Sequence, residues 1–143
     1  MMPGLLLRIF YSPRKVAGEI RIALRGEIPI NLSLTMDVPQ IDIYLEVTNL
    51  SNLKLELDRM LLDLWFGQPV LQGFILEHYK IPPRSSDTQI FYRSDLTSKQ
   101  IEQIRPYLTA SPPSGNISLS IIACFSSKIG TIEVNQRFER RKV

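Results

Sequence analysis

The chain has 143 residues, of which 44% are hydrophobic and 22% are charged. This length fits one domain with a substantial core, and the hydrophobic fraction excludes the intrinsically disordered class, whose low hydrophobicity prevents folding. One cysteine excludes an internal disulfide, and one histidine excludes any multi-histidine metal site.

The formal net charge of +3 is unevenly distributed. Basic residues outnumber acidic ones in 1–27 and again in 137–143, whereas the sequence between them is mildly acidic. A nucleic-acid-binding domain would place basic side chains and stacking aromatics on its folded body, so this distribution argues against specific nucleic-acid binding. The basic ends are predicted to be solubilising segments, with contact to anionic lipid or nucleic acid as the alternative.

No apolar stretch approaches the ~20 residues that a membrane-spanning helix needs. The N-terminus also lacks the continuous apolar core and the small-residue cleavage site of a signal peptide. Together with the missing disulfide framework, these features predict a cytoplasmic protein, or a membrane-attached one if the natural chain has an upstream anchor.

Residues 1–27 are predicted to be a basic N-terminal extension, and their pattern fits two structures. Ser12-Pro13 could begin a helix that stops at Gly26. Residues 19–25 also alternate between apolar and polar, as a strand does. We favour a strand over 19–25 that follows a poorly ordered segment.

Residues 28–143 are predicted to form one β-domain. Ile41–Asn52 gives the clearest pattern, because every second residue from Ile41 to Val47 is apolar, as in a half-buried strand. The alternation stops at Asn49, where short polar side chains can bond to nearby backbone and turn the chain. An earlier alternating run, from Ile30 to Val38, predicts the strand before it.

The alternation slips by one residue near Asp58–Met60, which predicts a bulge or a bend into a second sheet. Gly67 lies in a predicted turn. A strand is expected from Val70 to His78, with Gly73 as a bulge or as a point where another chain segment approaches closely.

A rigid corner is predicted around Pro82, Pro83 and Ser85, before a strand over Thr88–Leu96. A capping box over Thr97–Gln100 predicts one short helix, near 98–105, that ends by Pro106. Alternating runs Ile117–Phe125 and Ile132–Phe138 predict a terminal hairpin. About seven strands and one helix indicate an all-β, two-sheet antiparallel sandwich.

Few residues offer catalytic chemistry. His78 could form a dyad with Cys124, but a histidine at a strand end and a buried, inert thiol are the favoured interpretations. Carboxylates that could pair for acid–base work occupy outward strand positions, where a solvated charge is usual: Asp58, Asp63, Glu46 and Glu56. We therefore assign no catalytic, cofactor-binding or metal-binding residue. An enzyme would gain support if His78 lay beside a carboxylate within a deep pocket.

Trp65 falls on the polar phase of its strand. A half-exposed indole there could contact a partner. The favoured alternative is that it covers the second sheet or the open end of the sandwich.

The strand IDIYLEVTN and the polar turn from Asn49 to Asn52 resemble the strand and Asn-Pro-Asn turn of the second group of late embryogenesis abundant proteins. That group includes the water stress and hypersensitive response (WHy) domain. Leu50-Ser51 stands where the family has proline, which lengthens the turn by one residue. The resemblance covers roughly residues 30–140 and continues through the remaining turn residues: Gly67, Gly73, Pro82, Pro83 and Ser85.

This resemblance implies an immunoglobulin- or fibronectin type III-like sandwich without catalytic residues or cofactors. It also implies a non-enzymatic role in desiccation and other stress, through binding or protecting other macromolecules. The alternative is a membrane-apposed or assembly module that uses its basic ends to contact lipid or a larger complex. The expected partner is a protein or a membrane surface, and the chain is expected to be a monomer or a weak homo-oligomer.

Overall fold

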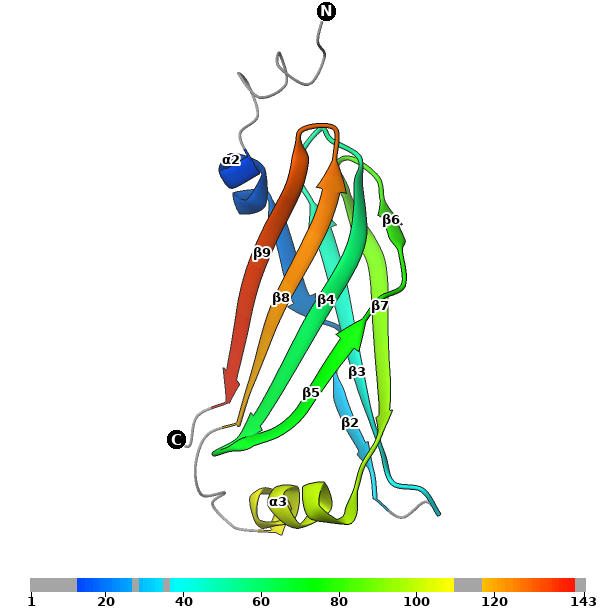
Figure 1. Ribbon diagram of the computed structural model, residues 1–143, viewed down its shortest axis with the longest axis vertical. Helices are drawn as coiled ribbons and strands as arrows, with labels where there is room; N and C mark the ends of the chain where they lie inside the picture. The colour runs from blue at the N-terminus through cyan, green and yellow to red at the C-terminus, as the bar shows by residue number, and fades with distance from the viewer. Residues whose placement is uncertain (1–12, 27–28, 35–36, 110–116, 141–143) are drawn as a thin grey trace, which may run out of the picture.

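The computed structural model describes residues 13–26, 29–34, 37–109 and 117–140, and it confirms an antiparallel β-sandwich of two sheets that lie face to face (Figure 1). The elements in chain order are α2 (Pro13–Gly18), β1 (Ile20–Leu24), β2 (Ile30–Ser33), β3 (Gln40–Asn49), β4 (Leu55–Phe66), β5 (Pro69–Ile75), β6 (Tyr79–Ile81), β7 (Ser85–Asp95), α3 (Ser98–Thr109), β8 (Ile117–Ser127) and β9 (Gly130–Arg140).

Sheet A consists of β1, β2, β3 and β7. β7 pairs along the length of β3, so β1 and β2 share the other edge, where they pair with opposite ends of β3. Tyr44 connects them: its carbonyl accepts from the Arg25 N–H at 3.0 Å, and its N–H donates to the Pro29 carbonyl at 2.8 Å. β1 and β2 therefore lie in line along the same edge of β3, with β1 ending at Leu24 and β2 beginning at Ile30.

Sheet B has the order β5-β4-β8-β9, and β6 also pairs with β4. β8 occupies one edge of β4, so β5 and β6 lie in line along the other edge and are separated at 76–78. The register of β4 with β8 shifts between Leu57 and Arg59, which leaves Asp58 as an extra residue. The predicted bulge is confirmed, and the strand stays in sheet B rather than bending into the other sheet.

The core lies between the sheets and is formed by their inward side chains. Every second residue from Ile41 to Val47 is fully buried, as the alternation of β3 predicts. α3 closes the lower end of the sandwich, and α2 lies beside β9 (Figure 1). No helix among the described residues is long and apolar enough to cross a membrane.

The N-terminal segment differs from its prediction in two respects. The strand favoured over 19–25 is present as β1, but the residues before it form α2 instead of a poorly ordered segment, while 1–12 lie outside the described residues. Because Val16 of α2 and Ile20 and Ile22 of β1 are buried in the core, the sandwich begins well before residue 28. The helix alternative is right about the start, because α2 begins at Pro13, but the helix ends at Gly18 and not at Gly26. A helix of only six residues depends on packing for its stability.

Three other elements end differently from their predictions. The strand expected from Ile30 to Val38 ends at Ser33, and Val38 is exposed. The strand expected over Val70–His78 is split into β5 and β6. The helix passes Pro106 and ends at Thr109. The described residues thus contain nine strands and two helices, compared with about seven strands and one helix expected.

Packing explains why α3 continues past its proline. Proline lacks an N–H and disfavours a helix interior. Ile104 is fully buried, however, and the Tyr107 ring packs edge-on against Phe66 with the ring centroids 5.5 Å apart. These contacts lie on both sides of Pro106 and hold the last turn in place.

Candidate functional site

Asn49, at the end of β3, connects two loops through its side-chain amide. The amide nitrogen donates to the carbonyls of Leu53, at 2.8 Å, and Pro82, at 3.1 Å. The amide oxygen accepts from the N–H of Ser51, at 3.0 Å, and from its hydroxyl, at 2.6 Å. The fully buried amide therefore uses both its donors and both its acceptor positions.

The corner between β6 and β7 is joined to the same turn. The Arg84 N–H donates to the Ser51 carbonyl at 3.0 Å, and Arg84 Nε donates to Asn52 Oδ1 at 2.5 Å. Pro83 precedes Arg84, and the Ser85 hydroxyl donates to the Pro82 carbonyl at 2.7 Å. The structure thus gathers the predicted turn and corner residues at one end of the sandwich, where they hold the backbone.

Gly67 and Gly73 each lie against the side chain of a tyrosine. Gly67 has a positive φ of 72°, and a Cβ at this position would overlap the Tyr107 hydroxyl. A Cβ on Gly73 of β5 would overlap the hydroxyl and ring of Tyr92, which comes from β7 in the other sheet. Gly73 is therefore a point of close approach, and its register with Leu62 is regular rather than bulged.

The outer face of sheet A carries a row of stacked side chains. The rings of Tyr44 and Phe91 pack with centroids 5.1 Å apart. The guanidinium of Arg25 lies 5.3 Å from the Tyr44 ring centre, and that of Arg93 lies 5.2 Å from the Phe91 ring centre. The ring contact joins β3 to β7, and the cation–π contact of Arg25, the residue after β1, joins the end of β1 to β3. The contact between Arg93 and Phe91 lies within β7.

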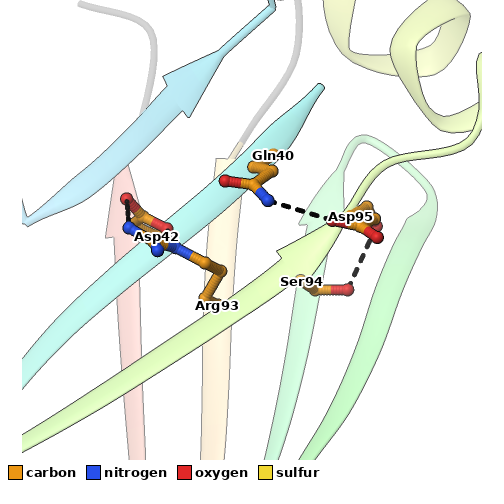
Figure 2. Close-up of polar contacts among 5 residues, drawn as sticks. All are labelled: Gln40, Asp42, Arg93, Ser94 and Asp95. Carbon is orange, nitrogen blue, oxygen red and sulfur yellow. Dashed lines mark hydrogen bonds and ion pairs between the residues drawn. The ribbon is translucent and has the colours of Figure 1, made fainter. Parts of the chain in front are cut away.

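Arg93 also forms a two-point ion pair with Asp42 across β3 and β7 (Figure 2). Its Nε and Nη2 donate to the two carboxylate oxygens at 2.7 and 3.2 Å. This pair explains how Asp42 can be buried, and it raises the pKa of Arg93 through the hydrogen bond and the charge of Asp42. Beside this pair, the Gln40 amide donates to the Asp95 carboxylate, and the Ser94 hydroxyl donates to the Asp95 backbone carbonyl. The contacts between Gln40 and Asp95 and between Asp42 and Arg93, shown in Figure 2, join β3 to β7.

The outer face of sheet B carries exposed apolar side chains. Leu61 of β4 lies opposite Phe74 of β5 and opposite Ile122 of β8. Phe74 is 61% exposed, Ile122 is 39% exposed, and Leu76, just after β5, is 67% exposed. We call Leu61, Phe74, Leu76 and Ile122 the apolar row. A hollow of about 320 Å³ lies along it, lined by three of its members and by Arg59, Met60, Cys124 and Glu133.

Trp65 lies on this outer face, further along β4 from Leu61, and is 39% exposed. The sequence predicts Trp65 on the polar, outward side of the strand, and its side chain does face outward, away from sheet A. The indole therefore does not cover the second sheet. Its role as a contact residue stays a prediction.

Glu56, Asp58 and His78 meet near the upper end of sheet B. His78 Nδ1 lies 3.7 Å from Asp58 Oδ1 and 4.0 Å from Glu56 Oε1. The His78 side chain is 59% exposed, so it lies beside carboxylates as an enzyme would require, but on the surface and not within a deep pocket. An open hollow of about 620 Å³ adjoins Glu56 and is lined by further residues: Lys54, Leu55, Lys80, Ile81, Pro82, Ser126, Ser127 and Lys128.

Cys124 is buried, as predicted, although its position on β8 faces outward. The guanidinium of Arg59 lies against it, and the hydrogen bond with Cys124 is the main cause of the raised pKa of Arg59. The thiol therefore borders the hollow along the apolar row.

Neither a protein-family model nor a curated protein matches the chain. Among solved structures, the X-ray structure of the Northeast Structural Genomics Consortium target SoR45 is 14% identical, with a TM-score of 0.55 over 85% of this chain and 84% of that chain. A crystal structure of a protein from Archaeoglobus fulgidus is 12% identical, with a TM-score of 0.49 over 87% and 97%. The solution structure of AT1g01470 from Arabidopsis thaliana is 12% identical, with a TM-score of 0.39 over 78% and 76%. The likeness to SoR45 shows a shared fold.

Sequence reasoning missed the apolar row and the meeting of His78 with two carboxylates. A signal for the row was present, because Phe74 and Ile122 occupy the polar phase of their strands, as Trp65 does. The carboxylates and His78 are brought together by the pairing of β4 with β5 and β6, and local sequence carries no signal for that pairing.

Proposed function

We propose that this protein is a non-enzymatic, stress-related β-sandwich that binds exposed apolar segments of other proteins and protects them during desiccation. The apolar row on the outer face of sheet B is the observation that supports this proposal. The resemblance of the Asn49 turn and the Pro82 corner to the late embryogenesis abundant group supports the association with stress.

The row stands out because an antiparallel sheet normally presents polar side chains on its solvent face. Phe74 and Leu76 each expose more than half of their surface, and Leu61 and Ile122 extend the apolar surface across two further strands. Contiguous exposed apolar surface of this kind is typical of interaction sites. Covering it with an apolar segment would yield roughly 25 cal/mol for each Å² removed from water.

The charges around the row favour a protein over a membrane as the partner. Arg59 and Glu133 border the hollow, and Asp63 lies between Leu61 and Trp65 along β4. Anionic lipid attracts clusters of basic residues, whereas this border carries both signs of charge. Binding of the basic ends to lipid is therefore the alternative, and flotation with anionic vesicles distinguishes it from binding of a protein by the apolar row.

The test compares protection of a labile enzyme through drying by the wild-type protein, by a Phe74→Ser/Leu76→Ser double variant and by an equal mass of albumin. The wild type should preserve more activity than albumin, and the double variant should lose that advantage. Val38→Ser is the matched control, because Val38 is also exposed but does not belong to the row. Equal protection by the wild type and the double variant would contradict the proposal.

Flotation with anionic vesicles separates the two partner classes. The proposed function predicts that the protein stays with the soluble fraction at physiological salt. Flotation that the double variant retains and that salt abolishes would instead support contact between the basic ends and lipid.

A further inference from the structure

We propose that Glu56, Asp58 and His78 form a binding site for a divalent transition-metal ion, with zinc as the best match. Each residue offers one ligand atom, and the three atoms lie within 4.8 Å of one another. This site is separate from the apolar row, and the proposal does not depend on the protective function.

The two carboxylates come from the bulged part of β4. Glu56 and Asp58 are two residues apart and both emerge on the outer face of sheet B. The register shift leaves Asp58 without a partner residue on β8, and bulges commonly re-aim a side chain in this way. The Ser126 hydroxyl donates to Asp58 Oδ1 at 3.1 Å and orients that carboxylate, as outer hydrogen bonds do for metal ligands.

His78 lies beside these carboxylates because the strands before and after it, β5 and β6, both pair with β4. Ile75 of β5 lies opposite Met60, and Tyr79 of β6 lies opposite Leu57. The intervening residues 76–78 therefore pass alongside Asp58 without entering the ladder. The break in the edge strand is what allows the imidazole to reach the outer face.

The observed spacing is close to that of a tetrahedral site. Ligand bonds of about 2.0–2.1 Å place neighbouring ligand atoms roughly 3.4 Å apart in such a site. The imidazole nitrogen is 3.7 and 4.0 Å from the two carboxylate oxygens, so small side-chain rotations would complete the geometry. All three side chains are more than one-third exposed, which leaves them free to rotate.

The ligand chemistry selects the kind of ion. Imidazole suits zinc, copper, nickel and iron, whereas magnesium and calcium prefer sites made only of oxygen. Two carboxylates also balance the double positive charge. Three protein ligands leave a fourth tetrahedral position for water or for a group from another molecule.

A bound ion would fasten residues 76–78 to β4. Leu76, a member of the apolar row, is two residues from His78, so the ion would also order one end of that row. This effect would appear as protection of the 76–78 backbone amides from hydrogen exchange.

The test titrates zinc chloride into untagged, chelator-treated protein and follows the imidazole signals by NMR. His78 is the only histidine, so these signals report on one site. We expect a saturable change with one ion bound per chain. His78→Ala, measured by calorimetry, and Asp58→Asn should each weaken binding by at least about tenfold.

Two variants serve as controls. Asp63→Asn makes the same charge change on the outer face of β4, roughly 16 Å further along the strand, and should leave affinity unchanged. Cys124→Ser removes the only thiol, an alternative zinc ligand, and should also bind normally. The proposal is wrong if excess zinc leaves the imidazole signals of the wild type unchanged, or if Cys124→Ser abolishes binding while His78→Ala retains it.

Discussion

The buried side chain of Asn49 donates a hydrogen bond to the carbonyl of Pro82, 33 residues away in the chain, at 3.1 Å. This bond joins the turn that follows β3 to the corner that precedes β7. The two segments are therefore parts of one hydrogen-bonded unit, although they are far apart in the sequence.

Asn49→Ala should destabilise the protein by about 3 kcal/mol, because it leaves several buried polar groups without partners. Urea unfolding followed by circular dichroism measures this loss. Asn52→Ala is the matched control: its side chain is exposed and accepts from Arg84, so its cost should be below about 1 kcal/mol. Equal losses in both variants would show that burial of the amide is unimportant.

Gly73→Ala should cost about 2 kcal/mol, because the new methyl group would overlap the Tyr92 hydroxyl and ring. Gly18→Ala is the control, since a Cβ there would meet no atom within 4 Å. Tyr92→Ala opens the space beside Gly73, so the double variant should lose less stability than the sum of the two single variants. Additive losses would mean that the two residues do not share this contact.

Thr97→Ala should destabilise α3 by about 1 kcal/mol. Thr97 Oγ1 accepts from the Gln100 N–H at 3.2 Å, and Gln100 Oε1 accepts from the Thr97 N–H at 2.9 Å, which confirms the predicted capping box. Thr97→Ser keeps the hydroxyl and should restore most of the stability. Thermal unfolding of the three proteins would decide this, and a Ser variant as unstable as the Ala variant would count against the cap.

The stability of the protein should fall at alkaline pH through Tyr79. Burial, followed by its hydrogen bond to Glu77, raises the pKa of Tyr79 above the ordinary value of 10.0. A raised folded-state pKa means that folding favours the protonated tyrosine. The contribution of this group to the free energy of unfolding is therefore complete below the ordinary pKa, and it is lost as the pH rises through the folded-state pKa.

The measurement is the free energy of unfolding in urea from about pH 9 to about pH 11. The wild type should lose more stability over this range than Tyr79→Phe, which has no hydroxyl to ionise. Parallel pH profiles would show that another group controls the alkaline loss.

Much of the architecture could be predicted from local patterns. The alternation of β3, the slip near Asp58 and the terminal hairpin follow from the period of two in a strand, and the structure contains all three. The split between β5 and β6 could not be predicted in this way. Leu76 continues the outward phase of Phe74, so the sequence continues to look like a strand where pairing has stopped.

The candidate sites depend on contacts between distant segments. Phe74 and Ile122 are identified as neighbours only when both are paired with Leu61. His78 likewise meets Asp58 and Glu56 through strand register, although its own neighbours in sequence predict an ordinary strand end. Turn residues such as Asn49 are easier to interpret, because two of the partners of Asn49, Ser51 and Leu53, are only two and four residues away.

The divided edge strands have a consequence for how the protein behaves at high concentration. Unpaired strand edges can join to the edges of other molecules and build aggregates. Here one edge of sheet A is divided between β1 and β2, and one edge of sheet B is divided between β5 and β6. Neither of these two edges offers a long ladder to a neighbouring molecule, so the protein can become concentrated without polymerising through β1, β2, β5 or β6.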